Sequence, residues 1–198
     1  MIFSRPSIGN DYSSRFRDEE SKESPMKGNC EAITIRHATL KDLDILVDQR
    51  HKMFEDIQHR SSKLHKAADT SYRRWIVNMT KKRRFVGFLA VKEDGEPVAG
   101  GCLWLRETQP SPGSMGTLMR PYLLSMYTKP KFRGRGIATL IVKEGMRWSK
   151  RRGYTSITLH ASRFGRSVYS NVGWKRTWEM RADLTKFPMN HFARRRRN

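Results

Sequence analysis

The chain has 198 residues, of which 37% are hydrophobic and 30% charged, and its 40 Lys and Arg against 19 Asp and Glu give a formal charge of +21. This length suits one domain with a core, and the five Trp, nine Phe and six Tyr exclude a chain that is disordered throughout. The absence of an apolar run of about 18 residues excludes a membrane-spanning helix, and Cys30 and Cys102 lack the spacing of a metal site or a disulfide framework.

Three segments are expected from the composition along the chain. Residues 1–30 are polar and almost without apolar periodicity, which predicts a flexible N-terminal tail. Residues 31–187 should form the folded domain, and residues 188–198 a basic C-terminal tail held extended by its like charges. The first residues resemble neither a secretory signal nor a transit peptide, so we expect a cytoplasmic protein with no membrane association.

A strand followed by two helical segments is predicted first in the folded part. Ala32 to Arg36 alternates apolar and polar residues as a strand does. Thr39 is a suitable N-cap for a helix through Phe54, and Ser71 to Met79 indicates a second helix. The basic cluster Lys81 to Arg84 is expected to be a solvated loop, with nucleic-acid contact as the alternative.

Three strands should follow. Phe85 to Val91 and Val98 to Leu105 are separated by Asp94-Gly95, a strong hairpin signal that predicts antiparallel pairing. Leu118 to Tyr127 indicates a third strand, which must end near Pro130. The loop between the second and third strands is rich in Pro and Gly.

The last elements complete an α/β pattern. Apolar residues between Gly136 and Lys150 leave one helical face suited to packing on a sheet, and a strand with Ile157 and Leu159 comes next. Arg166 to Asn171 should form a short helix and Trp174 to Met180 a last strand. The fold class predicted is therefore α/β, with a mixed, mostly antiparallel central sheet flanked by helices.

A loop with two glycines lies between the third strand and the long helix. Gly134 and Gly136 let a ligand approach the main chain, and a helix N-terminus directs unpaired N–H groups and a positive dipole at one point. This arrangement favours a phosphate site, although a tight basic turn would look the same. A dinucleotide fold would require a third glycine at Thr139, and a P-loop would require Lys after Gly136; neither is present.

Two blocks of sequence resemble the GCN5-related N-acetyltransferases (the GNAT family). The first is Met126 to Ala138, in which Arg133, Gly136 and Ala138 match the family's pyrophosphate pattern. The second is His160 to Trp174, which is similar to a family block with a Tyr on a short helix that ends at Gly before an aromatic residue. The resemblance spans about Ala32 to Asp183 and implies the GNAT fold, with acetyl-CoA as the cofactor.

The resemblance also implies which residues bind the cofactor. The strand around Met126 should pair with the pantetheine arm, and its N–H groups should polarise the thioester carbonyl. The loop that follows should hold the pyrophosphate, and Ser162 stands where relatives often have a cofactor-contacting Asn. The cofactor-binding residues implied are Met126, Tyr127, Thr128, Arg133, Gly134, Arg135, Gly136, Ile137, Ala138, Thr139 and Ser162.

Three residues are catalytic candidates. Tyr169 matches the family Tyr that protonates the departing thiolate, the alternative being a Tyr packed in the core. Carboxylates that act as general base in several relatives are missing here from Tyr122 to Tyr127 and from Thr155 to Leu159. Glu107 and His160 are the nearest groups able to replace them, and a water chain is a third option.

Two function classes follow from these observations. The first is an N-acetyltransferase that moves an acetyl group from acetyl-CoA to a primary amine by direct attack in a ternary complex. Its acceptor, a small molecule, an amino acid or a peptide, cannot be identified from the sequence. The second is a nucleic-acid or ribosome-associated protein that uses the basic surface. A homodimer is common among the relatives.

Overall fold

The computed structural model describes residues 32–58, 63–110 and 118–183. One compact unit begins at Ile33. The predicted tails, 1–30 and 188–198, lie outside the described residues, so the expected domain limits stay predictions. No helix within these three ranges is both long and apolar enough to span a bilayer.

A mixed sheet forms the centre of this unit, and within the described residues its strand order is β1-β2-β3-β4-β5. The first four strands pair antiparallel, and β5 pairs parallel to β4. This confirms the predicted α/β fold with a mostly antiparallel sheet. The strands are β1 (Thr34–His37), β2 (Phe85–Val91), β3 (Pro97–Glu107), β4 (Met119–Thr128) and β5 (Thr158–Leu159).

The turn between β2 and β3 confirms the hairpin predicted from Asp94-Gly95. Gly95 has a φ of 84°, which is in the left-handed region that favours glycine. The Gly95 N–H donates to the Lys92 carbonyl, and the Lys92 N–H donates to the Glu96 carbonyl. The register then brings Phe88 opposite Gly101 and Phe85 opposite Trp104.

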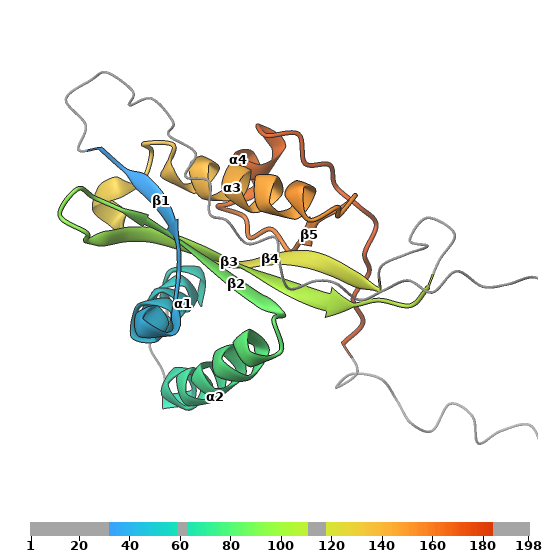
Figure 1. Ribbon diagram of the computed structural model, residues 1–198, viewed down its shortest axis with the longest axis horizontal. Helices are drawn as coiled ribbons and strands as arrows, with labels where there is room; N and C mark the ends of the chain where they lie inside the picture. The colour runs from blue at the N-terminus through green and yellow to red at the C-terminus, as the bar shows by residue number, and fades with distance from the viewer. Residues whose placement is uncertain (1–31, 59–62, 111–117, 184–198) are drawn as a thin grey trace, which may run out of the picture. The chain divides into compact units, whose positions relative to one another are not determined.

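Helices cover both faces of the sheet (Figure 1). The 3-10 turn η1 (Leu40–Asp42), α1 (Leu43–Gln58) and α2 (Lys63–Lys81) lie on one side, with α3 (Ile137–Arg151) and α4 (Arg166–Ser170) on the other. Side chains of β2 alternate between the two faces, as the period of a strand requires. Phe88 packs with the α3 side, whereas Leu89 packs with the α1 and α2 side.

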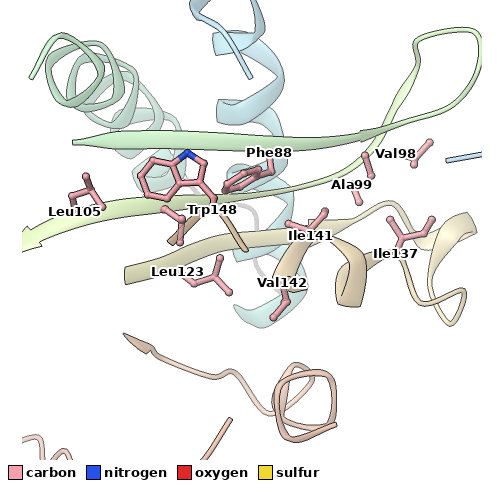
Figure 2. Close-up of a cluster of buried hydrophobic side chains, with 11 residues drawn as sticks. Phe88, Val98, Ala99, Leu105, Leu123, Ile137, Ile141, Val142 and Trp148 are labelled. Atoms are coloured by element: carbon pink, nitrogen blue, oxygen red, sulfur yellow. The ribbon is translucent and has the colours of Figure 1, made fainter. Parts of the chain in front are cut away.

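The larger core lies between the sheet and α3 (Figure 2). Its centre is Phe88, Ile141 and Val142, each fully buried. Truncation of such a side chain, for example Phe88 to Ala, typically costs about 3–5 kcal/mol. Since α3 begins at Ile137, this packing fixes the position of the loop that precedes it. The other members are Ala90, Val98, Ala99, Leu103, Leu105, Leu123, Ile137 and Trp148.

The second core lies under α1 and α2. Tyr72 and Ile76 of α2 are buried against Cys102 of β3 and against Leu46 and Val47 of α1. Burial raises the pKa of the Cys102 thiol to about 12, so the thiol stays protonated at neutral pH. This cluster holds both helices against the middle of the sheet.

The N-terminus of the first helix differs from the prediction in one detail. Thr39 caps the 3-10 turn η1 and α1 follows directly after it, so Thr39 is not the cap of the α-helix itself. The Asp42 carboxylate accepts the Thr39 N–H at 2.8 Å and a bidentate pair of hydrogen bonds from Arg36. This capping box tethers α1 to the end of β1.

Two of the predicted elements differ from those in the structure. The helix predicted over Ser71 to Met79 is the second half of α2, which begins at Lys63. The last strand predicted over Trp174 to Met180 is wrong, because these residues have no regular structure in the described part of the chain. Trp178 and Met180 are 89% and 94% exposed, so no packing partner holds the segment as a strand.

Candidate functional site

A bulge interrupts β4 near its C-terminal end. Gly100 pairs with Tyr127 while Cys102 pairs with Leu124, so one residue of β3, Gly101, faces the two remaining residues of β4. The first of them, Ser125, has a φ of 54°, which non-glycine residues rarely adopt. Such a bulge bends the strand and redirects the backbone groups that follow it.

Beyond the bulge β4 has no strand on its outer side among the described residues. The register with β5 joins Tyr122 to Thr158 and Leu123 to Leu159, after which β5 ends. The remainder of β4 therefore presents main-chain donors and acceptors that a strand-like ligand can pair with. This stretch contains the predicted cofactor residues Met126, Tyr127 and Thr128.

The glycine loop joins this stretch to α3. Gly134 and Gly136 have φ values of 76° and 77°, and apart from the adjoining residues no atom lies within 4 Å of the position that a Cβ would take on either. Within the described residues, no hydrogen bond uses the main-chain N–H of any residue from Gly134 to Thr139. The start of α3 thus offers a row of unpaired donors beside open space, as an anion requires.

Two cations at this loop already form ion pairs within the protein. The Arg133 guanidinium donates to the Thr128 carbonyl and forms an ion pair with Asp56 at 2.5 Å. The Lys129 ammonium forms an ion pair with Glu96 at 2.6 Å. The Arg133 side chain therefore ties the loop to the end of α1. Among the described residues, Lys131 and Arg135 form no ion pair, so their charges remain available to an anion.

Tyr169 lies on α4, on the same side of the sheet as α3. Its ring packs against Trp174, with centroids 5.8 Å apart, and against Gly165. Burial raises the pKa of Tyr169 above its usual value, so its Oη keeps its proton over the neutral range. Within the described residues this hydroxyl takes part in no hydrogen bond, which leaves it able to donate one.

The two candidates for the general base lie in different places. His160 follows β5 directly, and its Nδ1 lies 3.2 Å from the Tyr122 hydroxyl, next to the last register pairs of β4 and β5. Glu107 pairs in register with Met119, at the opposite end of β4 from Thr128. Its carboxylate is 62% exposed and lies 3.4 Å from Arg84. His160, and not Glu107, therefore lies near the point where the pairing of β4 with β5 ends.

Ser162 stands between β5 and α4. Its carbonyl accepts the Gly165 N–H, which forms the turn that begins α4. No hydrogen bond among the described residues joins the Ser162 side chain to the glycine loop, so its proposed cofactor contact stays a prediction. Of the predicted residues, those from Met126 to Thr139 lie on one continuous stretch of chain along β4, η3 (Pro130–Phe132) and the start of α3.

Two residues of α1 that the sequence did not single out also lie at this site. The Arg50 guanidinium stacks on the rings of Tyr72 and Phe54, at 4.2 and 4.6 Å from their centroids. Gln49 is buried with its amide against Gly100. In the sequence, Arg50 looks like any solvated residue of a charged helix. The structure distinguishes it by the burial of its Nη1.

Comparison with known proteins gives a consistent set of similarities. Residues 50–173 match the model of the acetyltransferase (GNAT) family. An uncharacterized N-acetyltransferase of Methanocaldococcus jannaschii is 27% identical over 129 residues, which is 64% of this chain and 52% of the relative. The chain therefore spans about half the length of that curated relative.

Solved structures resemble the fold closely. A GCN5-related N-acetyltransferase from Ralstonia eutropha matches with a TM-score of 0.70 and 27% identity, covering 78% of this chain and 99% of that one. A predicted acetyltransferase from Clostridium acetobutylicum, solved with acetyl-CoA, matches with a TM-score of 0.69 and 27% identity, covering 77% and 97%.

Proposed function

The chain belongs to the acetyltransferase (GNAT) family, and from that premise we propose that it transfers the acetyl group of acetyl-CoA to a primary amine. The transfer occurs by direct attack of the amine in a ternary complex. The observation that carries the proposal is the row of unpaired N–H groups at the start of α3, next to the part of β4 that β5 leaves unpaired. One relative of similar fold was solved with acetyl-CoA.

The residues at this junction fit the cofactor by charge and by shape. The main-chain donors from Gly134 to Thr139 would hold the pyrophosphate, because both glycines leave open space where a side chain would stand. The backbone from Met126 to Thr128 would hold the pantetheine arm as a neighbouring strand does. When bound, acetyl-CoA supplies the acetyl group as an activated thioester.

Tyr169 and His160 have separate roles in this proposal. Tyr169 holds a proton on Oη and donates it to the departing sulfur, a role that its raised pKa and its unpaired hydroxyl support. His160 is the better-placed candidate to accept a proton from the amine, directly or through water, because it borders the divergence of β4 and β5. We assign Glu107 no role in proton transfer.

A free-thiol assay tests the proposed function. The purified protein is incubated with acetyl-CoA and a panel of amines, amino acids, aminoglycosides and peptides, and released coenzyme A is measured. We expect saturable, acceptor-dependent thiol release. A protein that shifts RNA in a salt-dependent manner, and releases no thiol with any acceptor, would instead support the nucleic-acid-binding alternative.

A further inference from the structure

Arg50 is a half-buried cation that has no anionic partner among the described residues. Its guanidinium lies over the rings of Phe54 and Tyr72, and its Nη1 is buried with no hydrogen-bond acceptor. Among the described residues, Arg50 takes part in no ion pair. Stacking on aromatic faces offsets only part of the desolvation of this end of the guanidinium, so the buried Nη1 lacks an acceptor.

Gln49 provides a second buried donor next to it on α1. Its side chain is 4% exposed, and its Nε2 has no hydrogen-bond partner. The side chain occupies the space over Gly100, because a Cβ on that residue would overlap the Gln49 Oε1. A fixed amide with an unused N–H is rare in a protein interior, where buried donors are nearly always paired.

Both donors lie over the bulged part of β4. Gly100, under Gln49, pairs with Tyr127. Tyr72, under Arg50, has its hydroxyl 3.1 Å from the Ser125 Oγ at the bulge itself. The unpaired donors therefore border the stretch of β4 that has no pairing with β5.

The other cations of this part of α1 already have anions. His51 lies 2.6 Å from Asp69, and Lys52 lies 2.7 Å from Asp48. Arg50 is thus the residue of this segment that would gain an ion pair from a ligand. One guanidinium and one amide N–H match the charge and the acceptor oxygens of a single carboxylate.

We propose that Arg50 and Gln49 bind the carboxylate of the acceptor, so that the acceptor is an amino acid with a free carboxylate. This inference rests on the proposed function, since it specifies the acceptor of the same site. The carboxylate fixes one end of the acceptor on α1 and leaves its amine free to face β4. A peptide N-terminal amine lacks a carboxylate at that distance and is a poor substrate.

Matched pairs of acceptors test the proposal. The twenty standard L-amino acids and their carboxamides are compared by kcat/KM for thiol release, alongside glucosamine 6-phosphate and a tetrapeptide. We expect at least one amino acid to exceed its carboxamide by about 10-fold or more, because a charge-assisted pair is lost in the amide. Equal rates within every pair, or a preference for the peptide or the sugar phosphate, would overturn the proposal.

Variants assign the preference to Arg50. In Arg50→Met the ratio of amino acid to carboxamide should fall to near 1, and in Arg50→Lys, which keeps the charge without the fork, it should be intermediate. Arg73→Met is the matched control, since Arg73 of α2 forms an exposed ion pair with Asp44 of α1 and its loss should keep the ratio. A ratio unchanged in both Arg50 variants would contradict the assignment.

Binding of acetyl-CoA separates the two possible failures. The dissociation constant of acetyl-CoA, measured by calorimetry, should change less than about twofold in both Arg50 variants, because the residue does not touch the glycine loop in this account. If wild-type protein binds acetyl-CoA but no amino acid is acetylated, the acceptor inference fails alone. If it binds no acetyl-CoA, the proposed function fails with it.

Discussion

The Tyr72 hydroxyl lies 3.1 Å from the Ser125 Oγ, and this contact joins α2 to the bulge of β4. Ser125 adopts a φ of 54°, a conformation that needs support from its surroundings. Tyr72 is buried, and its ring also carries the stacked Arg50 guanidinium. The bulge that shapes the site is therefore coupled to the helix that faces it.

The first prediction concerns this contact. Tyr72→Phe and Ser125→Ala should each lower the free energy of unfolding by about 1 kcal/mol, the usual value of one hydrogen bond. The double variant should cost less than the sum, because the two changes remove the same interaction. Urea unfolding of the four proteins measures the coupling. Strict additivity would show that the hydroxyl pair contributes nothing.

The second prediction concerns the capping carboxylate. The Arg36 guanidinium, followed by the Thr39 N–H, lowers the pKa of Asp42 well below its usual range. A carboxylate with a folded pKa below its unfolded value stabilises the protein above about pH 4 and loses this effect as the pH falls through the folded pKa. Asp42→Asn should cost about 1–2 kcal/mol at pH 7 and less at pH 2.5. A cost equal at both pH values would contradict the assignment.

The third prediction concerns the link between α1 and α2. Asp69 and Glu55 raise the pKa of His51. A histidine with a raised pKa stabilises the fold fully below its unfolded pKa, about 6.5, and loses this effect as the pH rises through the folded value. The melting temperature of the wild type should fall between pH 6 and pH 9 more than that of His51→Gln. If the melting temperatures of the two proteins changed equally with pH, a charged His51 would be contradicted.

The fourth prediction concerns Tyr169. Tyr169→Phe should lower kcat by at least about 10-fold, since general acids typically contribute more than this, while acetyl-CoA affinity stays within about twofold. Steady-state kinetics and calorimetry measure the two quantities. Tyr154→Phe, a tyrosine stacked on Trp148 at the other end of α3, is the control and should keep its kcat. Normal turnover in Tyr169→Phe would remove the residue from the mechanism.

Much of the fold could be predicted from local signals. Asp94-Gly95 sets the β2–β3 hairpin, and the apolar face of α3 sets its packing on the sheet, as the buried Ile141 and Val142 confirm. The strand predicted over Trp174 to Met180 is wrong because the local sequence says nothing of a pairing partner. A strand without a neighbour cannot satisfy its main chain, and this segment has none among the described residues.

The site could be predicted only in part. The glycine loop could be predicted because the left-handed φ values of Gly134 and Gly136, 76° and 77°, favour glycine, which the sequence shows directly. The bulge could not be predicted, because Ser125 adopts its positive φ through tertiary contacts that no local sequence pattern encodes. Arg50 and Gln49 were missed for a similar reason, since their burial depends on Tyr72 and Gly100, which are distant in sequence.

The central claim is that main-chain donors at the start of α3 bind the pyrophosphate of acetyl-CoA. Titration calorimetry with Gly136→Val measures it most directly, and Gly153→Val is the matched control. Gly136 and Gly153 have φ values of 77° and 79° and open space around a Cβ, but Gly153 lies beyond the C-terminal end of α3. Equal backbone strain is thus introduced at both positions.

In this titration the wild type and Gly153→Val should bind acetyl-CoA with similar dissociation constants. Gly136→Val should bind at least about 10-fold more weakly, a loss of about 1.4 kcal/mol, because its side chain fills the space that the phosphates need. No binding by the wild type, or equal binding by both variants, would contradict the account.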